Sequence, residues 1–470
     1  MNQKKINLTI ISVILISSLN FVSNSKNNLG FSYHYSKIEN ESNLNYKHPH
    51  TSTLSSKIHI NNNWTAAKAA GICTGNGTYS DPYVIKNFFI DAENMDNCIK
   101  IENSNAAFRI ENCILINSRL EFVYNTGYAS IYLLNCQNGV LTNNTCTNSY
   151  IGIYLSRDCS NISIVNNNCT SNIQTGFTVG IFLNGCSNNN LIGNECYGSD
   201  DGIYIIGRSN NVINNICSDN SNGIECMGCQ NTIVGNDCSF NRNIGIFISS
   251  GYNPNDYNII SGNNCSYTRT GIYLGGRDTS VENWEISYNF CIWNSHGIEI
   301  WNTNNSKILN NQIVNSIVNG IVLDRCNSIT IVGNSVNIIG PYAICLNRHS
   351  TRNIIFFNCF DSPFCGYDNG SNNRWDIGIW GNFWSNYEGL DGNGDGVGDV
   401  PYNIFGSARS QDKYPLMKCD LASEPPLENS FDIIISIASI IGGNAILLGL
   451  LITNRKDLKK VRNRHYNRKK

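Results

Sequence analysis

The segment 144–155 reads Asn144-Thr-Cys146-Thr-Asn-Ser-Tyr-Ile-Gly152-Ile-Tyr-Leu155, and variants of it return along most of the chain. A Gly-Ile pair recurs at Gly152, Gly180, Gly202, Gly223, Gly245, Gly271, Gly297 and Gly320, with Ala343-Ile344 as a variant. An Asn-x-Cys triplet ends at Cys146, Cys169, Cys196, Cys217, Cys238, Cys265 and Cys291, and Ile313 and Val336 continue this column. Both columns advance by 21 to 28 residues a step, which is typical of a repeat protein.

Each repeat contains runs of three to five residues in which apolar residues alternate with others, bounded by Asn, Ser and Gly. A unit of this size cannot bury its apolar side chains alone, but coils stacked about 4.8 Å apart bury a continuous core. A leucine-rich repeat has a similar period, but its leucine spacing and helical return segment are missing. We therefore predict an all-β, right-handed parallel β-helix of about 11–12 coils over residues 84–360.

A solenoid of this kind needs a cap at each end, because an open terminal coil exposes apolar core and unpaired strand edges. Residues 61–83 are the predicted N-terminal cap, in which Trp64–Ala70 has helix-forming alanines. Residues 361–419 are the predicted C-terminal cap, where the period breaks and the aromatic residues Trp375, Trp380, Phe383, Trp384 and Tyr387 gather.

The two ends of the chain predict export and anchoring. Residues 1–25 have the layout of a secretory signal peptide, with Lys4 and Lys5 before an apolar run, although an uncleaved signal anchor is an alternative. Residues 26–60 are polar and are predicted to be flexible. Residues 420–432 form a predicted stalk, 433–453 a transmembrane helix of about 30 Å and 454–470 a basic cytoplasmic tail. We expect a single-pass protein whose N-terminal domain is extracellular; a buried core helix is the alternative for the apolar stretch.

The charge of the outer domain differs from that of the whole chain. Without the nine tail cations, Lys4, Lys5 and Asp457, the 33 basic and 35 acidic residues fall to 22 and 34. This acidic balance argues against binding of nucleic acid. N-glycosylation sequons agree with an exterior location and begin at Asn63, Asn76, Asn143, Asn161, Asn168, Asn264, Asn304 and Asn369.

Several motifs resemble the NosD-type β-helix proteins, a family labelled periplasmic copper-binding and grouped with carbohydrate-binding and sugar-hydrolysing β-helix domains. The matching pieces are the Asn-rich coils, Gly75-Asn-Gly-Thr78 with Asp81-Pro-Tyr83, Gly381-Asn-Phe-Trp384, the glycine-rich loop 391–399, and Asp412-Lys-Tyr-Pro-Leu416. The resemblance covers roughly residues 64 to 417 and implies the fold more strongly than an activity. Only the family label implies copper, since Met occurs four times and His seven times without ligand spacing, so we expect copper binding to be absent.

The loop Asp391-Gly-Asn393-Gly-Asp395-Gly-Val397-Gly-Asp399 predicts a calcium site. Its side-chain oxygens stand at loop positions 1, 3, 5 and 9, Val397 offers its carbonyl at position 7, and glycine occupies the sharp turn. Tyr402 replaces the usual bidentate Glu at position 12, and Glu388 or Asp412 would have to substitute for it. An acidic turn that binds nothing is the alternative.

The chain has 20 cysteines, which in a secreted protein would ordinarily indicate disulfides. Most of them fall in the Asn-x-Cys column or in a second column at Cys136, Cys159, Cys186, Cys229 and Cys326. We expect both columns to fill the core as small apolar side chains, with disulfides or metal thiolates as the alternatives. The best candidates for disulfide bonding are Cys73, Cys98, Cys359, Cys365 and Cys419, near the ends of the solenoid.

Candidate ligand contacts form an arginine and aspartate stripe, because basic residues recur five or six residues after the Gly-Ile or Ala-Ile pair. Such a stripe would bind the uronate or sulfate groups of an acidic glycan, although a solvated row of self-paired charges is the alternative. Its members are Arg157, Asp158, Arg208, Arg277, Asp278, Asp324, Arg325 and Arg348. Trp284, Trp293 and Trp301 lie on neighbouring coils and could stack on sugar rings.

No catalytic set emerges from the sequence. Asp200-Asp201 and His296-Gly297 resemble parts of a polygalacturonase pattern, but they lie about four coils, or roughly 20 Å, apart, which is too far for one glycosidic bond. We therefore expect a membrane-anchored extracellular protein that binds carbohydrate or serves as a surface interaction module. The alternatives are a polysaccharide lyase or hydrolase, a noncatalytic scaffold or adhesin that binds a surface protein, and a copper-handling NosD-like protein.

Overall fold

The computed structural model describes residues 53–118, 128–170, 177–249, 257–275 and 281–421. The predicted signal peptide, the transmembrane helix 433–453 and the basic tail lie outside the described residues, as do most of the flexible segment and of the stalk. Among the residues that are described, no helix has both the length and the apolar character needed to cross a bilayer.

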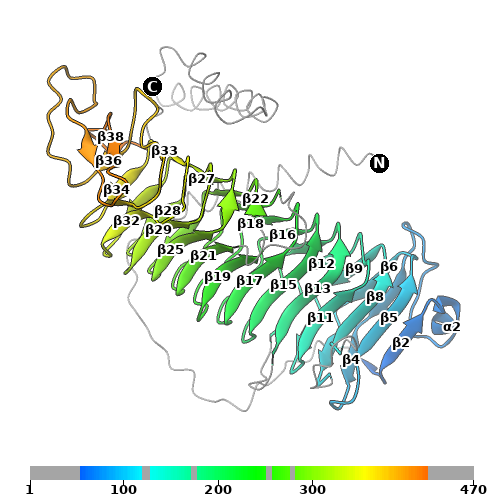
Figure 1. Ribbon diagram of the computed structural model, residues 1–470. Coiled ribbons are helices and arrows are strands. Elements are labelled where there is room, and N and C mark those ends of the chain that lie inside the picture. Colours follow the sequence, from blue (N-terminus) through cyan, green and yellow to red (C-terminus); the bar gives the residue numbers. More distant parts are fainter. Residues whose placement is uncertain (1–52, 119–127, 171–176, 250–256, 276–280, 422–470) are drawn as a thin grey trace, which may run out of the picture. The chain divides into compact units, whose positions relative to one another are not determined.

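The longest sheet, here called sheet 1, has 13 parallel strands stacked in chain order (Figure 1). The Gly-Ile pairs lie within its strands. They are β2 (Ile58–Asn61), β5 (Ile99–Ser104), β8 (Ile131–Cys136), β11 (Ile151–Ser156), β13 (Val179–Ser187), β15 (Asp201–Arg208), β17 (Asn222–Met227), β19 (Ile244–Ser249), β21 (Thr270–Gly275), β25 (His296–Trp301), β29 (Asn319–Asp324), β32 (Tyr342–Leu346) and β35 (Gly366–Asp368).

Sheet 2 follows sheet 1 within every coil and has 12 parallel strands. They are β3 (Tyr83–Lys86), β6 (Phe108–Glu111), β9 (Gly139–Thr142), β12 (Ser163–Val165), β14 (Asn190–Ile192), β16 (Asn211–Ile213), β18 (Thr232–Val234), β20 (Ile259–Ser261), β23 (Glu285–Ser287), β27 (Lys307–Leu309), β30 (Thr330–Val332) and β33 (Ile354–Phe356).

Sheet 3 closes each coil and is the least regular of the three. Single bridges at Asn168, Glu195, Ile216, Asp237 and Asn264 connect its two runs of strands. The runs are β1 (Thr53–Leu54), β4 (Phe88–Asp91), β7 (Ile114–Ile116) and β10 (Thr145–Thr147), then β24 (Phe290–Ile292), β28 (Gln312–Val314), β31 (Ser335–Asn337), β34 (Cys359–Asp361) and β36 (Phe383–Trp384). Outside the three sheets, β22 (Val281–Glu282) pairs with β26 (Thr303–Asn304), and β37 (Tyr402–Asn403) pairs with β38 (Gln411–Asp412).

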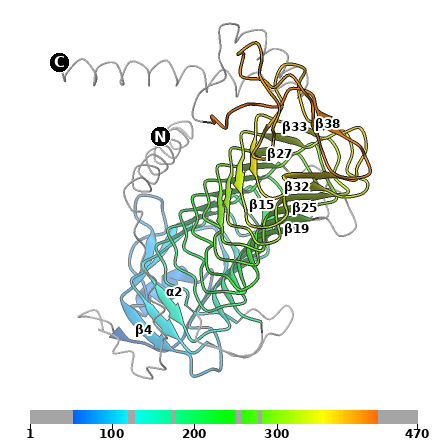
Figure 2. The ribbon, with the colours of Figure 1, turned by 90° about the vertical axis from the view of Figure 1, so that its left-hand side faces the viewer.

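The chain therefore repeats the order sheet 1, sheet 2, sheet 3 for about 12 turns, which confirms the predicted parallel β-solenoid and its number of coils. Figure 2 shows the coils stacked one behind another. We call the connections turn 1–2, turn 2–3 and turn 3–1 after the sheets that they join. Neighbouring strands are parallel and in register, so equivalent residues of successive coils form columns along the solenoid.

The glycine and cysteine columns of the repeat face one another inside the solenoid. A Cβ added at Gly152 would lie 2.6 Å from the carbonyl oxygen of Gly180 and 2.9 Å from Cβ of Cys169. The same conflict recurs at Gly180 and Gly245. The glycines are therefore required because the next coil and the cysteine column occupy the space of a side chain.

The asparagine of each Asn-x-Cys triplet is buried at turn 2–3 and forms a continuous ladder. Each Nδ2 donates to Oδ1 of the next asparagine and to a backbone carbonyl of the preceding coil, as Asn215 does to Asn236 at 2.9 Å and to Leu191 at 2.9 Å. Each Oδ1 also accepts the backbone N–H of the preceding ladder residue. The ladder comprises Asn144, Asn167, Asn194, Asn215, Asn236, Asn263, Asn289, Asn311, Asn334, Asn358 and Asn382.

A buried carboxylate receives the last donor of this ladder. Asp412 accepts the backbone N–H of Asn382 at 2.7 Å and the indole N–H of Trp384 at 2.9 Å. Burial raises the pKa of Asp412 to about 6 although these hydrogen bonds favour its charged form. Turn 1–2 carries a second, shorter set of stacked asparagines, as in the bonds from Asn189 to Asn210 and from Asn353 to Asn373. Its last member, Asn373, likewise donates to the buried Asp368 at 3.0 Å. The C-terminal cap thus supplies an acceptor for each column of donors.

The N-terminal cap contains helix α2 (Trp64–Ala69). Its Trp64 is buried, stacks on Tyr83 with ring centroids 4.7 Å apart, and donates to Oγ of Ser104 at 2.7 Å. The prediction of a flexible segment up to residue 60 is wrong at its end, because Ile58–Asn61 forms β2. Ile58 and Ile60 alternate into the core and extend it by one coil.

The cysteine columns consist of free thiols that pack in the core. Every member is buried except Cys229, which is half-buried, and burial raises the pKa of Cys217 and Cys238 well above the usual thiol value. Of the five cysteines that we expected near the ends, Cys359 and Cys419 are joined by a disulfide and the other three are free.

The asparagine ladder predicts a large stability loss on substitution. In Asn236→Leu, two N–H donors of Asn215 and the carbonyl of Val212 lose their buried partner. We expect the free energy of unfolding to fall by about 3 kcal/mol or more, measured by denaturant titration. The control Asn337→Ala removes one exposed hydrogen bond and should cost less than about 1 kcal/mol. Equal losses in the two variants would contradict the ladder's role.

The assignment of the cysteines predicts a thiol count. The denatured, unreduced protein should react with a thiol reagent at 18 of its 20 cysteines, and at all 20 after reduction. Because the thiols are buried away from the reagent, few should react in the folded protein. A count far below 18 would show that the columns are oxidised.

Candidate ligand-binding face

The outer face of sheet 1 carries aromatic and acidic side chains on successive strands. The residue after each Gly-Ile pair points away from the core, because its two neighbours along the strand are buried inside. Directly paired in this column are Tyr204, Glu225, Phe247, Tyr273 and Glu299, on β15, β17, β19, β21 and β25. All five are half-buried, and we call them the band.

Toward the N-terminal end, the band continues as a stack of rings. Centroids of Tyr132, Tyr154, Phe182 and Tyr204 follow one another at 5.1, 4.9 and 4.9 Å. The first three rings are buried and form, with Ile151 and Val179 among others, an apolar cluster separate from the core. The stack orders the column and leaves Glu225 as the first acidic position after it.

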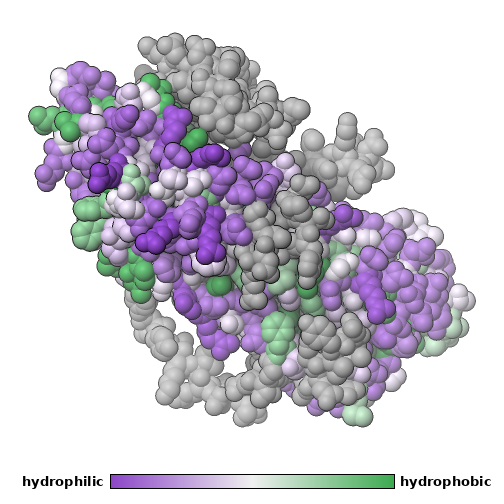
Figure 3. All heavy atoms as spheres, in the orientation of Figure 1, coloured by the Kyte–Doolittle hydropathy of each residue, from purple (hydrophilic) through white to green (hydrophobic). Residues whose placement is uncertain are grey.

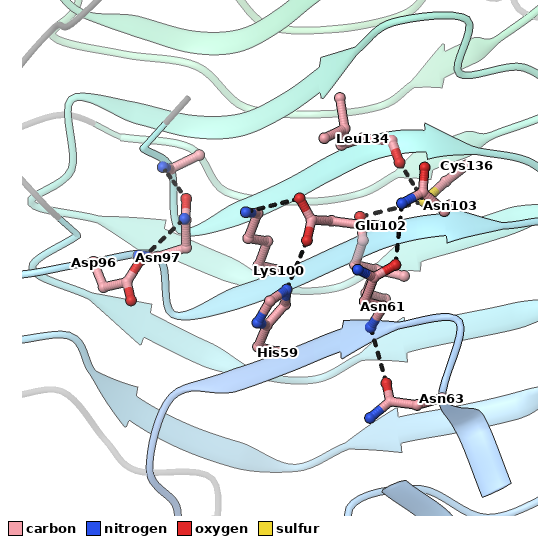
Figure 4. Close-up of polar contacts among 12 residues, drawn as sticks. His59, Asn61, Asn63, Asp96, Asn97, Lys100, Glu102, Asn103, Leu134 and Cys136 are labelled. Atoms are coloured by element: carbon pink, nitrogen blue, oxygen red, sulfur yellow. Dashed lines mark hydrogen bonds and ion pairs between the residues drawn. The ribbon is translucent and has the colours of Figure 1, made fainter. Parts of the chain in front are cut away.

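Charged residues begin the same column on the first two strands of sheet 1 (Figure 4). Glu102 accepts from His59 at 2.7 Å and from Lys100 at 2.8 Å, and Lys100 lies 5.7 Å from the ring centroid of Tyr132. Burial favours the neutral form of Glu102, but these two partners hold its pKa below the usual value. Beside them, Asn103 bridges Asn61 and the next coil in an exposed row of amides.

A second outward column borders the band at the beginning of the strands. Asp201 is buried, accepts from Nδ2 of Asn222 at 3.0 Å, and has its pKa raised to about 6 by burial. Its Oδ2 is without a hydrogen-bond partner within the described part of the chain, as are Nδ1 of His296 and Oδ1 of Asn319. His296 and Asn319 are paired in register on β25 and β29. The face therefore has unused hydrogen-bonding capacity beside its aromatic column.

The carboxylates of this face are poorly placed for joint catalysis. Glu225 and Glu299 are three strands apart, which is about 14 Å at the usual spacing. Asp201 and His296 are four strands apart, or about 19 Å, which confirms the predicted separation. Cleavage of a glycosidic bond needs two carboxyl groups within about 10 Å, so Glu225 and Glu299 cannot supply it together. Asp201 and His296 are also too far apart to act on one bond.

The predicted arginine and aspartate stripe lies at the other end of the sheet 1 strands. Arg157, Arg208 and Arg348 are exposed at the ends of β11, β15 and β32. Arg325 is 3.8 Å from Asp324 and 5.4 Å from the ring centroid of Trp301. Arg277 and Asp278 lie outside the described residues. On the β29 coil, at least, the charges pair with one another.

The three tryptophans that we expected to act together are separated by the fold. Trp284 is buried at turn 1–2, Trp293 is exposed at turn 3–1, and Trp301 is exposed at the end of β25. Adjacent coils place residues together only when they stand at the same position of the repeat.

The calcium-like loop is exposed and internally hydrogen-bonded. Asp391 accepts N–H groups of Gly394 at 2.7 Å and Gly396 at 2.9 Å, while Asp399 accepts from Gly392 at 2.7 Å. Tyr402, at position 12, is buried against Trp384. The suggestion that Asp412 could replace the missing ligand is wrong, because it is buried in the cap.

Within residues 53–421, excluding the gaps named above, no three His, Cys, Asp or Glu side chains are grouped so as to hold a metal ion. The two cysteine columns also do not fit a copper site, since their described thiols pack in the core and burial raises the pKa of Cys217 well above the usual thiol value. His59 is bonded to Glu102, far from His296 along sheet 1.

Two family models match consecutive parts of the solenoid. Residues 97–256 match the family described as "Right handed beta helix region", and residues 251–389 match "Periplasmic copper-binding protein (NosD)". No curated protein matches the sequence significantly.

Three of the solved structures to which the chain is similar, each at a TM-score below 0.5, are two epimerases and an adhesin. The periplasmic alginate epimerase AlgG is 12% identical, with 68% of this chain and 80% of that chain covered and a TM-score of 0.29. The Azotobacter vinelandii mannuronan C-5 epimerase AlgE4 A-module is 12% identical, with 66% of this chain and 87% of that chain covered and a TM-score of 0.33. PfbA, a surface adhesin of Streptococcus pneumoniae, is 11% identical, with 62% of this chain and 79% of that chain covered and a TM-score of 0.34.

The two family matches adjoin and together extend from residue 97 to residue 389, over most of the three-sheet solenoid. The chain therefore contains a right-handed parallel β-helix region at residues 97–256, followed by a segment, residues 251–389, that matches the NosD family.

Proposed function

We propose that this protein is a membrane-anchored, extracellular β-helix that binds carbohydrate along the band. The observation that carries the proposal is the direct register of Tyr204, Glu225, Phe247, Tyr273 and Glu299 on the outside of sheet 1. Aromatic rings offer apolar faces and edges to the C–H groups of a sugar, and carboxylates accept hydrogen bonds from its hydroxyls.

The arrangement favours binding of an extended chain over cleavage. The band crosses five strands and therefore extends for about 19 Å along the solenoid, long enough for several sugar units. Asp201 is too deeply buried to reach a substrate, and the accessible glutamates are too far apart to act as an acid and base pair. A binding module needs neither.

The exposed arginines provide a second, more polar contact in this proposal. Arg157 and Arg208 lie at the C-terminal ends of β11 and β15, two strands apart in sheet 1. Within the described part of the chain, neither is among the arginines that pair with a carboxylate. They would bind a uronate or sulfate group by charge-assisted hydrogen bonds, whereas Arg325 is held by Asp324 and Trp301. An acidic glycan would thus be held by these arginines at the ends of the sheet 1 strands and would stack on the aromatic rings of the band.

Export and anchoring complete the proposal. The apolar stretch 433–453 followed by nine cations supports one membrane span with the solenoid outside. The sequon residues Asn143 and Asn161 are exposed at turns, where a glycan could be attached.

The proposal predicts glycan retention that depends on the band. The full chain in detergent should be retained on a glycan array, and Phe247→Ala or Tyr273→Ala should weaken retention at least tenfold, about 1.4 kcal/mol, by removing ring contacts. The control Tyr79→Ala removes an aromatic ring that is 82% exposed and lies outside the band, where its hydroxyl donates to Asn138 at 2.8 Å.

Three results would count against this proposal. Retention unchanged in both band variants would remove the band as the site. Release of reducing or unsaturated ends from the bound polysaccharide would indicate an enzyme. Binding to a surface protein that survives its deglycosylation would indicate an adhesin.

We also propose that loop 391–399 binds calcium and stabilises the C-terminal cap, with Asp391, Asn393, Asp395, Val397 and Asp399 as ligands. In the structure the carboxylates of this loop are not grouped for a metal ion, so binding requires Asp391 and Asp399 to exchange their hydrogen bonds with backbone N–H groups for contacts with the ion. The turns at Gly394 and Gly396, with φ of 76° and 88°, support the required curvature.

Calcium should raise the melting temperature of the full chain by several degrees, because it binds only the folded loop. Asp395→Ala should abolish this rise without lowering the melting temperature measured in chelator. The absence of both a calcium-dependent rise and a calorimetric binding heat would eliminate the site.

A further inference from the structure

Turn 3–1 exposes at least one apolar side chain on each of six consecutive coils, from the coil of β19 to that of β35. Their side chains are between 39% and 58% exposed, whereas the surface in Figure 3 is predominantly hydrophilic. We call them the ridge: Phe240, Tyr267, Trp293, Ile317, Val318, Ile339 and Phe364.

The aromatic half of the ridge stands where the backbone disfavours such residues. Phe240, Tyr267 and Trp293 have φ of 56°, 58° and 58°, in the left-handed region that a bulky side chain rarely adopts. On other coils the same turn position has Gly198, with φ of 71°, or Asp219. The turn therefore does not require aromatic residues, and their retention at a conformational cost points to a use at the surface.

The ridge differs from the band in the ligand that it suits. Phe240 and Tyr267 stack on each other with centroids 4.7 Å apart and planes 2° apart, so their edges rather than their faces point outward. Ile317, Val318 and Ile339 neither stack on sugar rings nor form side-chain hydrogen bonds. Aliphatic residues and ring edges that are exposed on the same turn of successive coils are complementary to an apolar environment rather than to a glycan.

Cations accompany the aromatic half. Arg242 and Arg269 are exposed, each two residues after a ridge aromatic, at Phe240 and Tyr267. The acids close to this half in the sequence or the stack are Asp219, one coil earlier, and Asp237, three residues before Phe240, which accepts hydrogen bonds from Ser239 and Asn264. Aromatic residues and arginines together are typical of the headgroup region of a bilayer.

The place where the chain leaves the solenoid brings the ridge within reach of a membrane. Cys419 is bonded to Cys359 on β34, and 13 residues separate it from Ile433. Fully extended, these residues span about 45 Å at most. The ridge covers five steps between coils, or about 24 Å, and ends at the coil that contains the disulfide.

We propose that the ridge lies on the outer surface of the bilayer in which the chain is anchored, so that the solenoid rests along the membrane. This inference depends on the anchoring part of the proposed function. Because the span already holds the domain at the membrane, a shallow and individually weak apolar contact is sufficient to orient it. The two arginines contact lipid phosphates beside the inserted side chains.

The test uses the full chain reconstituted in phosphatidylcholine vesicles, with or without bromine on the acyl chains. Bromine quenches tryptophan fluorescence on contact, so brominated lipid should quench the wild type, and Trp293→Phe should lose this component. Trp301→Phe is the matched control, because Trp301 is 38% exposed but stands off the ridge. Ile317→Asn with Ile339→Asn should reduce the quenching at least twofold.

Alkaline carbonate extraction of the same vesicles separates failure of the ridge from failure of the anchor. If the chain resists extraction, but brominated lipid quenches the wild type and Trp293→Phe equally, the ridge is overturned and the anchor stands. If carbonate removes the chain from the vesicles, but the wild type is quenched and Trp293→Phe is not, the ridge is supported and the membrane span is refuted. Removal without quenching would overturn both. Dimerisation abolished by Ile317→Asn, without quenching, would identify a second copy as the partner and overturn the lipid contact.

Discussion

The buried asparagine ladder is the interaction on which the rest of this structure depends. Each ladder amide satisfies its own hydrogen bonds only when a further coil supplies the next amide, as in the chain of contacts from Asn144 to Asn382. The backbone turns away from sheet geometry at this point, so its N–H and C=O groups would otherwise be buried without partners. The ladder therefore imposes register on neighbouring coils, and the carboxylate of Asp412 ends it with an acceptor that needs no further coil.

Once the interior columns are set, the outward positions are free to vary, and function is found there. The same register that aligns Ile203 with Ile224 inside aligns Tyr204 with Glu225 outside. The band and the three aromatic residues Phe240, Tyr267 and Trp293 of the ridge are consequences of this alignment, because one side chain at a repeated position becomes a row when coils are stacked. The other ridge residues stand one to three positions later in the same turn. Their chemistry differs because the band alternates rings with carboxylates, while the ridge consists of aliphatic residues and ring edges.

The fold could be predicted because its columns keep their residue type. Glycine and cysteine recur since a side chain at Gly152 would collide with the next coil and with Cys169. The band was missed because its members change between aromatic and acidic, so no identity repeats, although each is the second residue after a column glycine. The ridge had a comparable signal, two residues after Cys238, Cys265 and Cys291. The pairing of Arg325 with Asp324 and Trp301, by contrast, depends on side-chain conformation, which spacing does not reveal.

Hydrogen exchange at turn 2–3 tests the ladder most directly. The backbone N–H groups of Asn194, Asn215 and Asn236 are bonded to ladder side chains rather than to a strand. Mass spectrometry of peptides that cover these turns should show them exchanging as slowly as the adjoining strands of sheet 2, over hours, because opening one coil requires breaking the ladder on both sides. Exchange of these amides within seconds, beside protected strands, would contradict the account.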